Sequence, residues 1–337
     1  MRNVHEALPE AMHLLRAEGV RRESRNGPVL QVPMPVTTMY THPQERVLFW
    51  SQRDANPFFH FYEGLWMLNG QHDVKSLTRF VKRMGQFSDD SVTFRGAYGR
   101  RWRHHFGFDQ LAVIAARLRH DHDDRRQVLQ MFDAGFDLND QKGMRDIPCN
   151  LSACFQVNDG ELDMVVYNRS NDIVWGCYGA NAVHFSMLHE VMAAWVEVPM
   201  GRYWQVSFNW HAYLDTAEPL LALADQARGP YSEGRRTPYE MGLIEPFPMI
   251  TRGASVDVWM NELRMFMSEE DRALGYRDPF FRRVAIPMVR THNAYRTGGD
   301  ARFDMALAEA ANIYATDWRT AATEWLQRRK DKARGQD

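Results

Sequence analysis

The chain has 337 residues, of which 45% are hydrophobic and 25% are charged, and this ordinary globular mixture excludes a disordered, collagen-like or coiled-coil protein. Its 41 basic and 43 acidic residues give a formal net charge of −2, so no overall basic field favours nucleic acid as a partner. The three cysteines are not the paired set of a disulfide scaffold, and no apolar stretch is long enough to span a membrane. We therefore expect a cytoplasmic protein without a membrane or nucleic-acid partner.

The first part of the chain mixes helical patterns with loops. Apolar spacing predicts a helix over residues 4–18, and the prolines and glycines of 19–44 predict loops and short strands. Residues 57–68 are densely apolar, the polar stretch 85–105 predicts a loop, and 109–120 have the spacing of a helix.

Strands gather in the middle of the chain, and helices return after them. Residues 126–133 and 151–167 have strand character, and Asn158-Asp159-Gly160 is a strong hairpin-turn signal. The later predicted elements are a helix over 181–197, a strand over 203–210, and helices over 256–268 and 301–330, followed by a frayed charged tail. Without an internal repeat or linker, we expect one α+β domain over residues 1–337, with a mixed sheet flanked by helices. Its core covers about residues 20–220, and 221–337 are mostly helical.

A carboxylate and a cysteine are the main candidates for chemistry. Glu63 lies in an apolar segment, where a buried carboxylate is costly unless it is paired or protonated. Such positions are often functional, although a structural ion pair is the alternative. Cys149 lies at a loop-to-strand junction, and Arg169 ends the next strand of the hairpin. A nearby arginine favours the nucleophilic thiolate, whereas the competing interpretation is a small buried hydrophobe, which we expect for Cys154 and Cys177.

Other motifs give weaker indications. Arg125 and Arg126 precede a strand, and their planar guanidinium groups suit a phosphate, although neighbouring aspartates can equally balance them in solvent. The histidines lack the spacing of a metal-binding helix, and no glycine-rich phosphate loop is present. We therefore expect no metal site.

Three segments occur in a specific order: Asp146-Ile147-Pro148-Cys149-Asn150, then YNRSNDIVWGCYGAN over 167–181, then NWHAYLD over 209–215. Together with FHFYEGLWMLNG over 59–70 and GAYGRRWR over 96–103, they resemble the thymidylate synthase superfamily, which includes the pyrimidine nucleotide hydroxymethylases. The resemblance runs from about residue 25 to residue 220 and implies the fold of that superfamily.

The resemblance implies a role for each matching residue. Cys149 is then the nucleophile, and Glu63, Tyr98 and Asn181 are further catalytic residues. The residues implied to bind the nucleotide are Arg25, Arg125, Arg126, Arg169, Ser170, Asp172, Asn181, His211 and Tyr213.

Several of these roles are more specific. Arg169 is implied to bind the phosphate and to lower the pKa of the thiol. Arg125 and Arg126 are supplied by the neighbouring subunit, which implies a homodimer with shared active sites. Asp172 is similar to the residue that hydrogen-bonds the folate pterin. His211 and Tyr213 resemble the pair that holds the sugar 3′-hydroxyl.

The resemblance also implies the reaction. Addition of the Cys149 thiolate at carbon 6 of a pyrimidine makes carbon 5 nucleophilic toward the one-carbon unit of the co-substrate 5,10-methylenetetrahydrofolate. The resulting exocyclic methylene takes hydride in a reductive thymidylate synthase and water in a hydroxymethylase. Glu63 moves protons in this site through water.

Two departures from the reductive enzymes favour water. The interval 86–99 lacks their tryptophan, and a long helical C-terminal region stands where they have a short apolar tail. We therefore expect a hydroxymethyltransferase that acts on dUMP, dCMP or CMP. Reductive thymidylate synthase is the first alternative, and a nucleotide- or RNA-binding protein without turnover is the second.

The choice of base depends on the start of the helix predicted over 181–197. There an asparagine amide suits uracil, and an aspartate suits cytosine. The GCYGAN loop is one residue longer than is usual in the family, so either Asn181 or Ala180 occupies the position. The base, uracil or cytosine, and the sugar, deoxyribose or ribose, therefore both stay open. Hydroxymethylated pyrimidines suggest bacteriophage DNA modification or nucleoside-antibiotic synthesis, in a bacterial or phage-infected cytoplasm.

Overall fold

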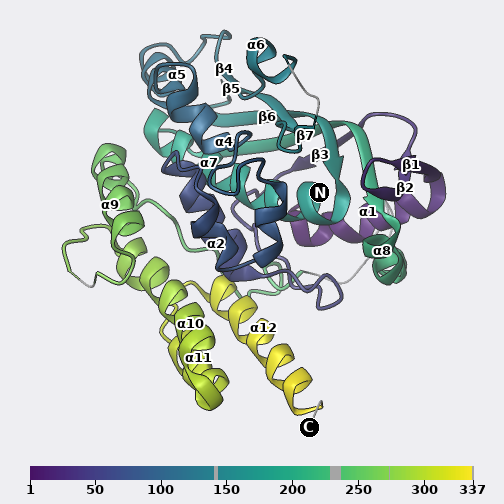
Figure 1. Cartoon of the computed structure of the whole chain (residues 1–337). Helices are drawn as coiled ribbons and strands as arrows, with labels where there is room; N and C mark the ends of the chain where they lie inside the picture. The colour runs from purple at the N-terminus through teal and green to yellow at the C-terminus, as the bar shows by residue number, and fades with distance from the viewer. Residues whose placement is uncertain (140–142, 228–236, 273, 336–337) are drawn as a thin grey trace.

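A mixed seven-stranded sheet is the centre of the computed structural model, which describes residues 1–139, 143–227, 237–272 and 274–335 (Figure 1). The strands are β1 (Val20–Ser24), β2 (Gly27–Val32), β3 (Val36–Tyr40), β4 (Val128–Gln130), β5 (Asn150–Asn158), β6 (Glu161–Asp172) and β7 (Met200–Tyr213). Their order is β1-β2-β7-β6-β5-β4, and β3 pairs with β7 beside β2. Among the described pairs, β6 and β7 alone run parallel, so the expected α+β fold with a mixed sheet is confirmed.

Two core helices cover one face of the sheet. Helix α7 (Asn181–Val196) packs on β6 and β7, and α2 (Pro57–Leu68) packs on α7. Helix α2 begins where it does because the Asn56 side chain accepts hydrogen bonds from two backbone N–H groups of the first turn and Pro57 fits the first helical position. Almost all side chains of α2 are buried, so Glu63 lies within the core layer.

The other helices surround this centre. They are α1 (Val4–Glu18), α3 (Val74–Thr78), η1 (Lys82–Phe87), α4 (Tyr98–Arg100), η2 (Arg101–His105), α5 (Gln110–His120), α6 (Ala134–Asp137), η3 (Ile173–Ala180), α8 (Leu214–Ala217), η4 (Glu218–Gln226), α9 (Val256–Ser268), η5 (Phe281–Ala285), α10 (Ile286–Thr297), η6 (Gly299–Ala301), α11 (Arg302–Ala310) and α12 (Thr316–Arg334). Helices α9 to α12, green to yellow in Figure 1, form a layer against α2, where Trp325 packs edge-on against Phe58.

The predicted hairpin is confirmed at its turn. Asp159 and Gly160 connect β5 to β6 with φ angles of 51° and 79°. Two consecutive positive φ values are the conformation of a type I′ turn, which matches the twist of the paired strands and favours Asp-Gly. The turn sets the register in which Asn150 lies opposite Asn168 and brings Cys149 beside Arg169.

Several predictions about elements differ from the structure. The polar stretch 85–105 contains α4 and η2, because its charges are not all solvated: Arg101 is fully buried in an ion pair with Asp137. The helix predicted over 301–330 is two helices, and α12 continues through the charged tail to Arg334. The strand predicted over 126–133 is short, and helix α10 was not predicted.

Candidate active site

A cavity of about 450 Å³ gathers five of the predicted binding residues: Arg25, Arg169, Ser170, His211 and Tyr213. The loop after β1 and the ends of β6 and β7 bring them together, because β2, β7 and β6 are neighbours in the sheet. The other lining residues are Glu23, Ser24, Asn26, Val29, Gln31, Phe132, Leu138, Arg145, Ile147 and Asn209. Three arginines and one carboxylate line this cavity, so its charge suits an anion such as a phosphate.

Arg169 holds the loop that carries the cysteine. Its backbone N–H donates to the carbonyl oxygen of Cys149 at 2.9 Å, and its guanidinium Nε and Nη2 donate to the carbonyls of Pro148 and Ile147, each at 2.9 Å. Burial raises the pKa of the Cys149 thiol, while the positive charges of Arg169 and Arg25 oppose that shift. Arg169 therefore lowers the thiol pKa as expected, although burial raises it by more.

Tyr98 contacts the same backbone from the other side. Its hydroxyl oxygen accepts hydrogen bonds from the N–H groups of Cys149 at 3.2 Å and Asn150 at 3.3 Å. Burial raises the pKa of Tyr98 well above its usual value, so the phenol stays neutral. In this geometry Tyr98 fixes the position of the nucleophile.

Glu63 faces a histidine that the sequence did not suggest. Its Oε2 lies 3.3 Å from Nε2 of His184 on α7. Burial raises the pKa of Glu63 to about 8 and lowers the pKa of His184 to about 3, so near neutral pH both groups are uncharged. The expected raised pKa of Glu63 is confirmed. No local pattern around His184 could have shown this contact, because it depends on how α2 packs on α7.

Asn181 lies at the first position of α7, where the extra residue of the GCYGAN loop is absorbed. The preceding η3 is π-helical, and π-helical turns accommodate one residue more than an α-helix. The Asn181 side chain donates to Oδ1 of Asn171 at 3.0 Å, and Nδ2 of Asn171 donates to Oγ of Ser207 at 3.0 Å. A side chain at Gly176 would collide with this pair, since its Cβ would lie 2.7 Å from Oδ1 of Asn171. The geometry thus gives the oriented amide to Asn181 and places Ala180 in η3.

Asp172 has one oxygen that fits a further ligand. One carboxylate oxygen accepts a hydrogen bond from the N–H of Trp175, and the other, Oδ2, is buried without a partner. Burial raises the pKa of this carboxyl. A buried oxygen of this kind suits an N–H donor of a bound heterocycle, so the residues present fit a folate pterin.

Arg125 and Arg126 are not brought to the cavity. Both side chains are exposed just before β4, and Arg126 pairs with Asp124 of the same chain at 2.8 Å. In one chain they therefore do not act with Arg25 and Arg169.

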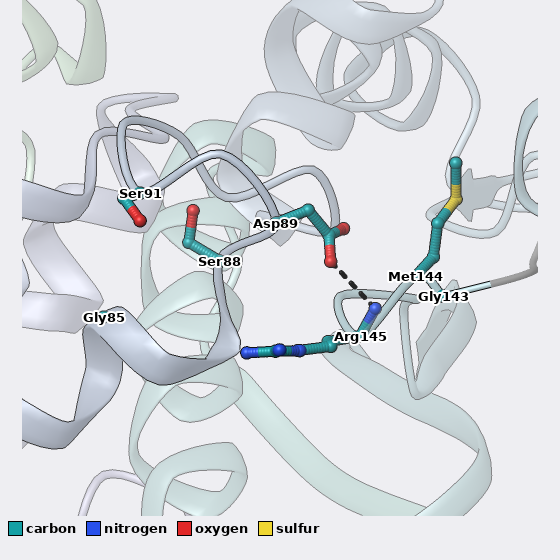
Figure 2. A pocket seen from close by; sticks show the side chains of 7 residues that line it. All are labelled: Gly85, Ser88, Asp89, Ser91, Gly143, Met144 and Arg145. Carbon is teal, nitrogen blue, oxygen red and sulfur yellow. Dashed lines mark hydrogen bonds between the residues drawn. The ribbon is translucent and has the colours of Figure 1, made fainter.

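A second cavity of about 500 Å³ lies next to the first (Figure 2). Its lining residues are Gly85, Ser88, Asp89, Ser91, Gly143, Met144 and Arg145, and Asp89 accepts the backbone N–H of Arg145 at 2.9 Å. Arg145 lines both cavities, and no motif around it predicts this role. The interval 86–99, which lacks a tryptophan, contributes Ser88, Asp89 and Ser91 to this second cavity. The lining of the cavity is mostly polar or glycine.

The described residues contain no group of side chains that could hold a metal ion. No described helix combines the length and the apolar character needed to cross a membrane.

Comparison with known proteins gives a consistent result. The model of the thymidylate synthase family matches residues 10–233. A deoxyuridylate hydroxymethyltransferase of Pseudomonas phage M6 is 56% identical over 98% of this chain and 93% of its own length. A deoxyuridylate hydroxymethyltransferase of Bacillus phage SP01 is 36% identical over 70% of this chain and 63% of its own length. A thymidylate synthase of Vesicomyosocius okutanii is 27% identical over 45% of this chain and 58% of its own length.

Proposed function

Because the chain belongs to the thymidylate synthase family, we propose that it transfers a hydroxymethyl group to carbon 5 of the uracil ring of dUMP. The observation that carries this proposal is the nearly full-length similarity to a deoxyuridylate hydroxymethyltransferase, whereas the thymidylate synthase above matches less than half of the chain. The geometry supports the same reaction, because Cys149 lies beside Arg169 of the anion cavity and Glu63 is a buried carboxyl whose raised pKa suits proton exchange.

The phosphate of the nucleotide binds to Arg25, Arg169 and Ser170, which line the cavity. His211 and Tyr213 lie in the same cavity with their rings 5.5 Å apart and hold the sugar hydroxyl. The two negative charges of a phosphate balance the positive charge of the arginines that line the cavity. Binding therefore anchors the nucleotide at the end remote from the reacting carbon.

Cys149 begins the reaction by adding its sulfur to carbon 6 of the ring, which makes carbon 5 nucleophilic. The thiol must first lose its proton, and Arg169 and Arg25 stabilise the resulting thiolate. Tyr98 and Arg169 hold the backbone on either side of the sulfur, so the attack geometry is fixed before the substrate arrives.

The folate co-substrate supplies a one-carbon unit at the oxidation level of formaldehyde, and the unpaired Oδ2 of Asp172 accepts a hydrogen bond from its ring when it is bound. Carbon 5 bonds to the one-carbon unit and loses its proton, and tetrahydrofolate leaves with the electron pair of the broken carbon–nitrogen bond, which gives an exocyclic methylene. Water then adds to this methylene, its proton goes to the carboxylate form of Glu63, and the electron pair moves into the ring as an enolate. The bond between Cys149 and carbon 6 then breaks, which restores the free thiolate. Since Glu63 titrates near pH 8, it can both accept and return a proton under physiological conditions.

Asn181 favours uracil over cytosine. With one N–H engaged by Asn171, its amide still offers a carbonyl oxygen and one N–H. Uracil presents an N–H beside a carbonyl and matches this pair, whereas cytosine presents an acceptor beside an amino group. The relatives named as acting on deoxyuridylate support the same choice.

A homodimer completes the site. One face of the sheet carries a row of side chains in register, Val128, Cys154, Val165, Trp204 and Met39, which are partly or fully exposed in the single chain. A second copy of the chain would bury this flat, mainly apolar face. Arg125 and Arg126 project just before β4, at the edge of the same face, and would reach the partner's phosphate site.

The reaction is tested by incubating the protein with dUMP and 5,10-methylenetetrahydrofolate and analysing both products. We expect 5-hydroxymethyl-dUMP together with tetrahydrofolate, as seen by mass spectrometry. Formation of dTMP with dihydrofolate would identify a reductive enzyme instead. A parallel incubation with dCMP should give little product, and a preference for dCMP would overturn the assignment of the base.

A further inference from the structure

His184 is buried directly against Glu63. It lies on α7 one turn after Asn181, so the face of α7 that presents the base-reading amide also presents this imidazole to α2. The His184 side chain is 4% exposed and the Glu63 side chain is 12% exposed, so both groups are largely removed from bulk solvent.

The hydrogen bonds of His184 determine which ring nitrogen carries the hydrogen. The ring makes a hydrogen bond to the backbone of His60 that favours its charged form, as an N–H donated to a carbonyl does. The N–H of His60 is already given to the carbonyl of Asn56. Since Nε2 of His184 has no hydrogen-bond partner, the donor to His60 is Nδ1. Nε2 therefore carries a lone pair and lies 3.3 Å from Oε2 of Glu63, although the angles of this contact are not those of a formed hydrogen bond.

Two acceptors at this distance need a hydrogen between them. A deprotonated Glu63 would place a negative charge against a lone pair in a buried site, which is unfavourable. A protonated Glu63 supplies the hydrogen and removes both the charge and the unpaired nitrogen. The other titratable or charged neighbours of this pair are His60 on α2, whose ring centroid lies 6.3 Å from that of His184, and Arg53 ahead of α2, which opposes a charge on His60.

We propose that His184 is a positioning residue for Glu63, whose Oε2 hydrogen it accepts so that Oε1 is presented to the reacting water and the nucleotide. This inference rests on the proposed function of Glu63. A hydrogen bond of this kind favours the neutral carboxyl, which is the same direction in which burial shifts the Glu63 pKa. Because the partner is an imidazole without charge, it orients the carboxyl without holding it permanently ionised.

The direct test is a titration of Glu63 in the ligand-free protein by NMR, with ¹³C-labelled glutamate and the Glu63→Gln variant to assign the signal. In His184→Leu the acceptor is lost, and we expect the midpoint of Glu63 to fall by about one pH unit, the shift that corresponds to one hydrogen bond. His184→Gln keeps an acceptor close to the position of Nε2 and should hold the midpoint. An unchanged midpoint in His184→Leu would overturn the proposal, whatever happens to turnover.

His189 provides the matched control. It is a second buried histidine on α7, and its Nε2 contacts the carbonyl of Leu162 instead of Glu63. His189→Gln should leave the Glu63 midpoint unchanged. If His184→Leu does not fold, ¹⁵N shifts of the wild-type imidazole decide the question: a protonated Nε2 on neutral His184 would contradict the proposal. Neither measurement needs substrate, so an error in the assigned reaction cannot imitate either result.

Discussion

At the scale of single residues, burial sets the resting state of this site. It raises the pKa of both Cys149 and Glu63, so the nucleophile and the carboxyl are uncharged before the nucleotide binds. A neutral thiol is a poor nucleophile, and the arginines can stabilise the thiolate only against the cost of desolvation. In the proposed mechanism, formation of the Cys149 thiolate therefore depends on the charges of Arg169 and Arg25.

We predict that Cys149→Ala abolishes turnover and leaves dUMP binding within about threefold, because the phosphate and the sugar are held by other residues. Steady-state kinetics and isothermal titration calorimetry measure the two effects. Cys154→Ala is the control, since Cys154 pairs with Val128 of β4 and does not line the cavity. Substantial activity of Cys149→Ala would exclude a covalent mechanism.

Glu63→Gln should lower the rate by roughly two to four orders of magnitude, the range for loss of a general base. It should also change how stability depends on pH. Between the ordinary pKa of 4.5 and the folded value of about 8, the folded wild type binds one proton more than the unfolded chain, so its stability falls as pH rises. Glutamine removes this contribution. Thermal midpoints of both proteins across that pH range test it, and parallel curves would contradict the assigned pKa.

At the scale of elements, the junction between β6 and α7 is where we propose that the base is read. The π-helical η3 absorbs one extra residue, and Asn171 at the end of β6 then hydrogen-bonds Asn181 at the start of α7. Neither element alone orients the amide. We therefore propose that the base is chosen through the contact between Asn171 of β6 and Asn181 of α7, two elements that the π-helical η3 connects.

Asn171→Ala should raise the KM for dUMP by about tenfold, because the Asn181 amide loses the partner that orients it, a loss of roughly one hydrogen bond. The kcat should fall less than the affinity, since Cys149 and Glu63 remain in place. Asn158→Ala, at the other end of the same hairpin, removes a comparable bond to Asp163 and is the control. Equal kinetic effects of the two substitutions would refute the role of Asn171.

At the scale of the whole molecule, the proposed site takes residues from two chains. The cavity contains Arg25, Arg145 and Arg169 but not the two exposed arginines before β4. The uncovered sheet face offers the surface by which a second chain would deliver them. Oligomeric state and activity should therefore change together.

Two inactive variants should complement each other. A mixture of Cys149→Ala with the double variant Arg125→Ala/Arg126→Ala should recover about a quarter of wild-type activity, since half of randomly formed dimers are hybrids with one intact site. Activity is measured after subunit exchange has been verified by differential tagging. No recovery in exchanged samples would place these arginines outside the partner's site.

Trp204→Glu should produce an inactive monomer, because a charge in the centre of the sheet face cannot be buried against a second copy. Sedimentation velocity and turnover measure the two effects. Leu243→Glu changes an exposed apolar residue outside the sheet and should stay dimeric and active. A dimeric, active Trp204→Glu protein would remove this face from the proposed interface.

The sequence by itself determined the α+β class, the hairpin turn and the segments that carry Cys149, Arg169 and Asn181, because local pattern and ordered motifs are properties of the chain. It could not give the pairing of Glu63 with His184, the cavity role of Arg145 or the burial of Arg101 with Asp137. Each of these joins residues of different elements, so only the packing of those elements decides it. The pKa of Cys149 divides in the same way: the effect of the neighbouring arginine could be predicted from the sequence, whereas the burial that outweighs it arises only when the sheet, its loops and α4 surround the thiol.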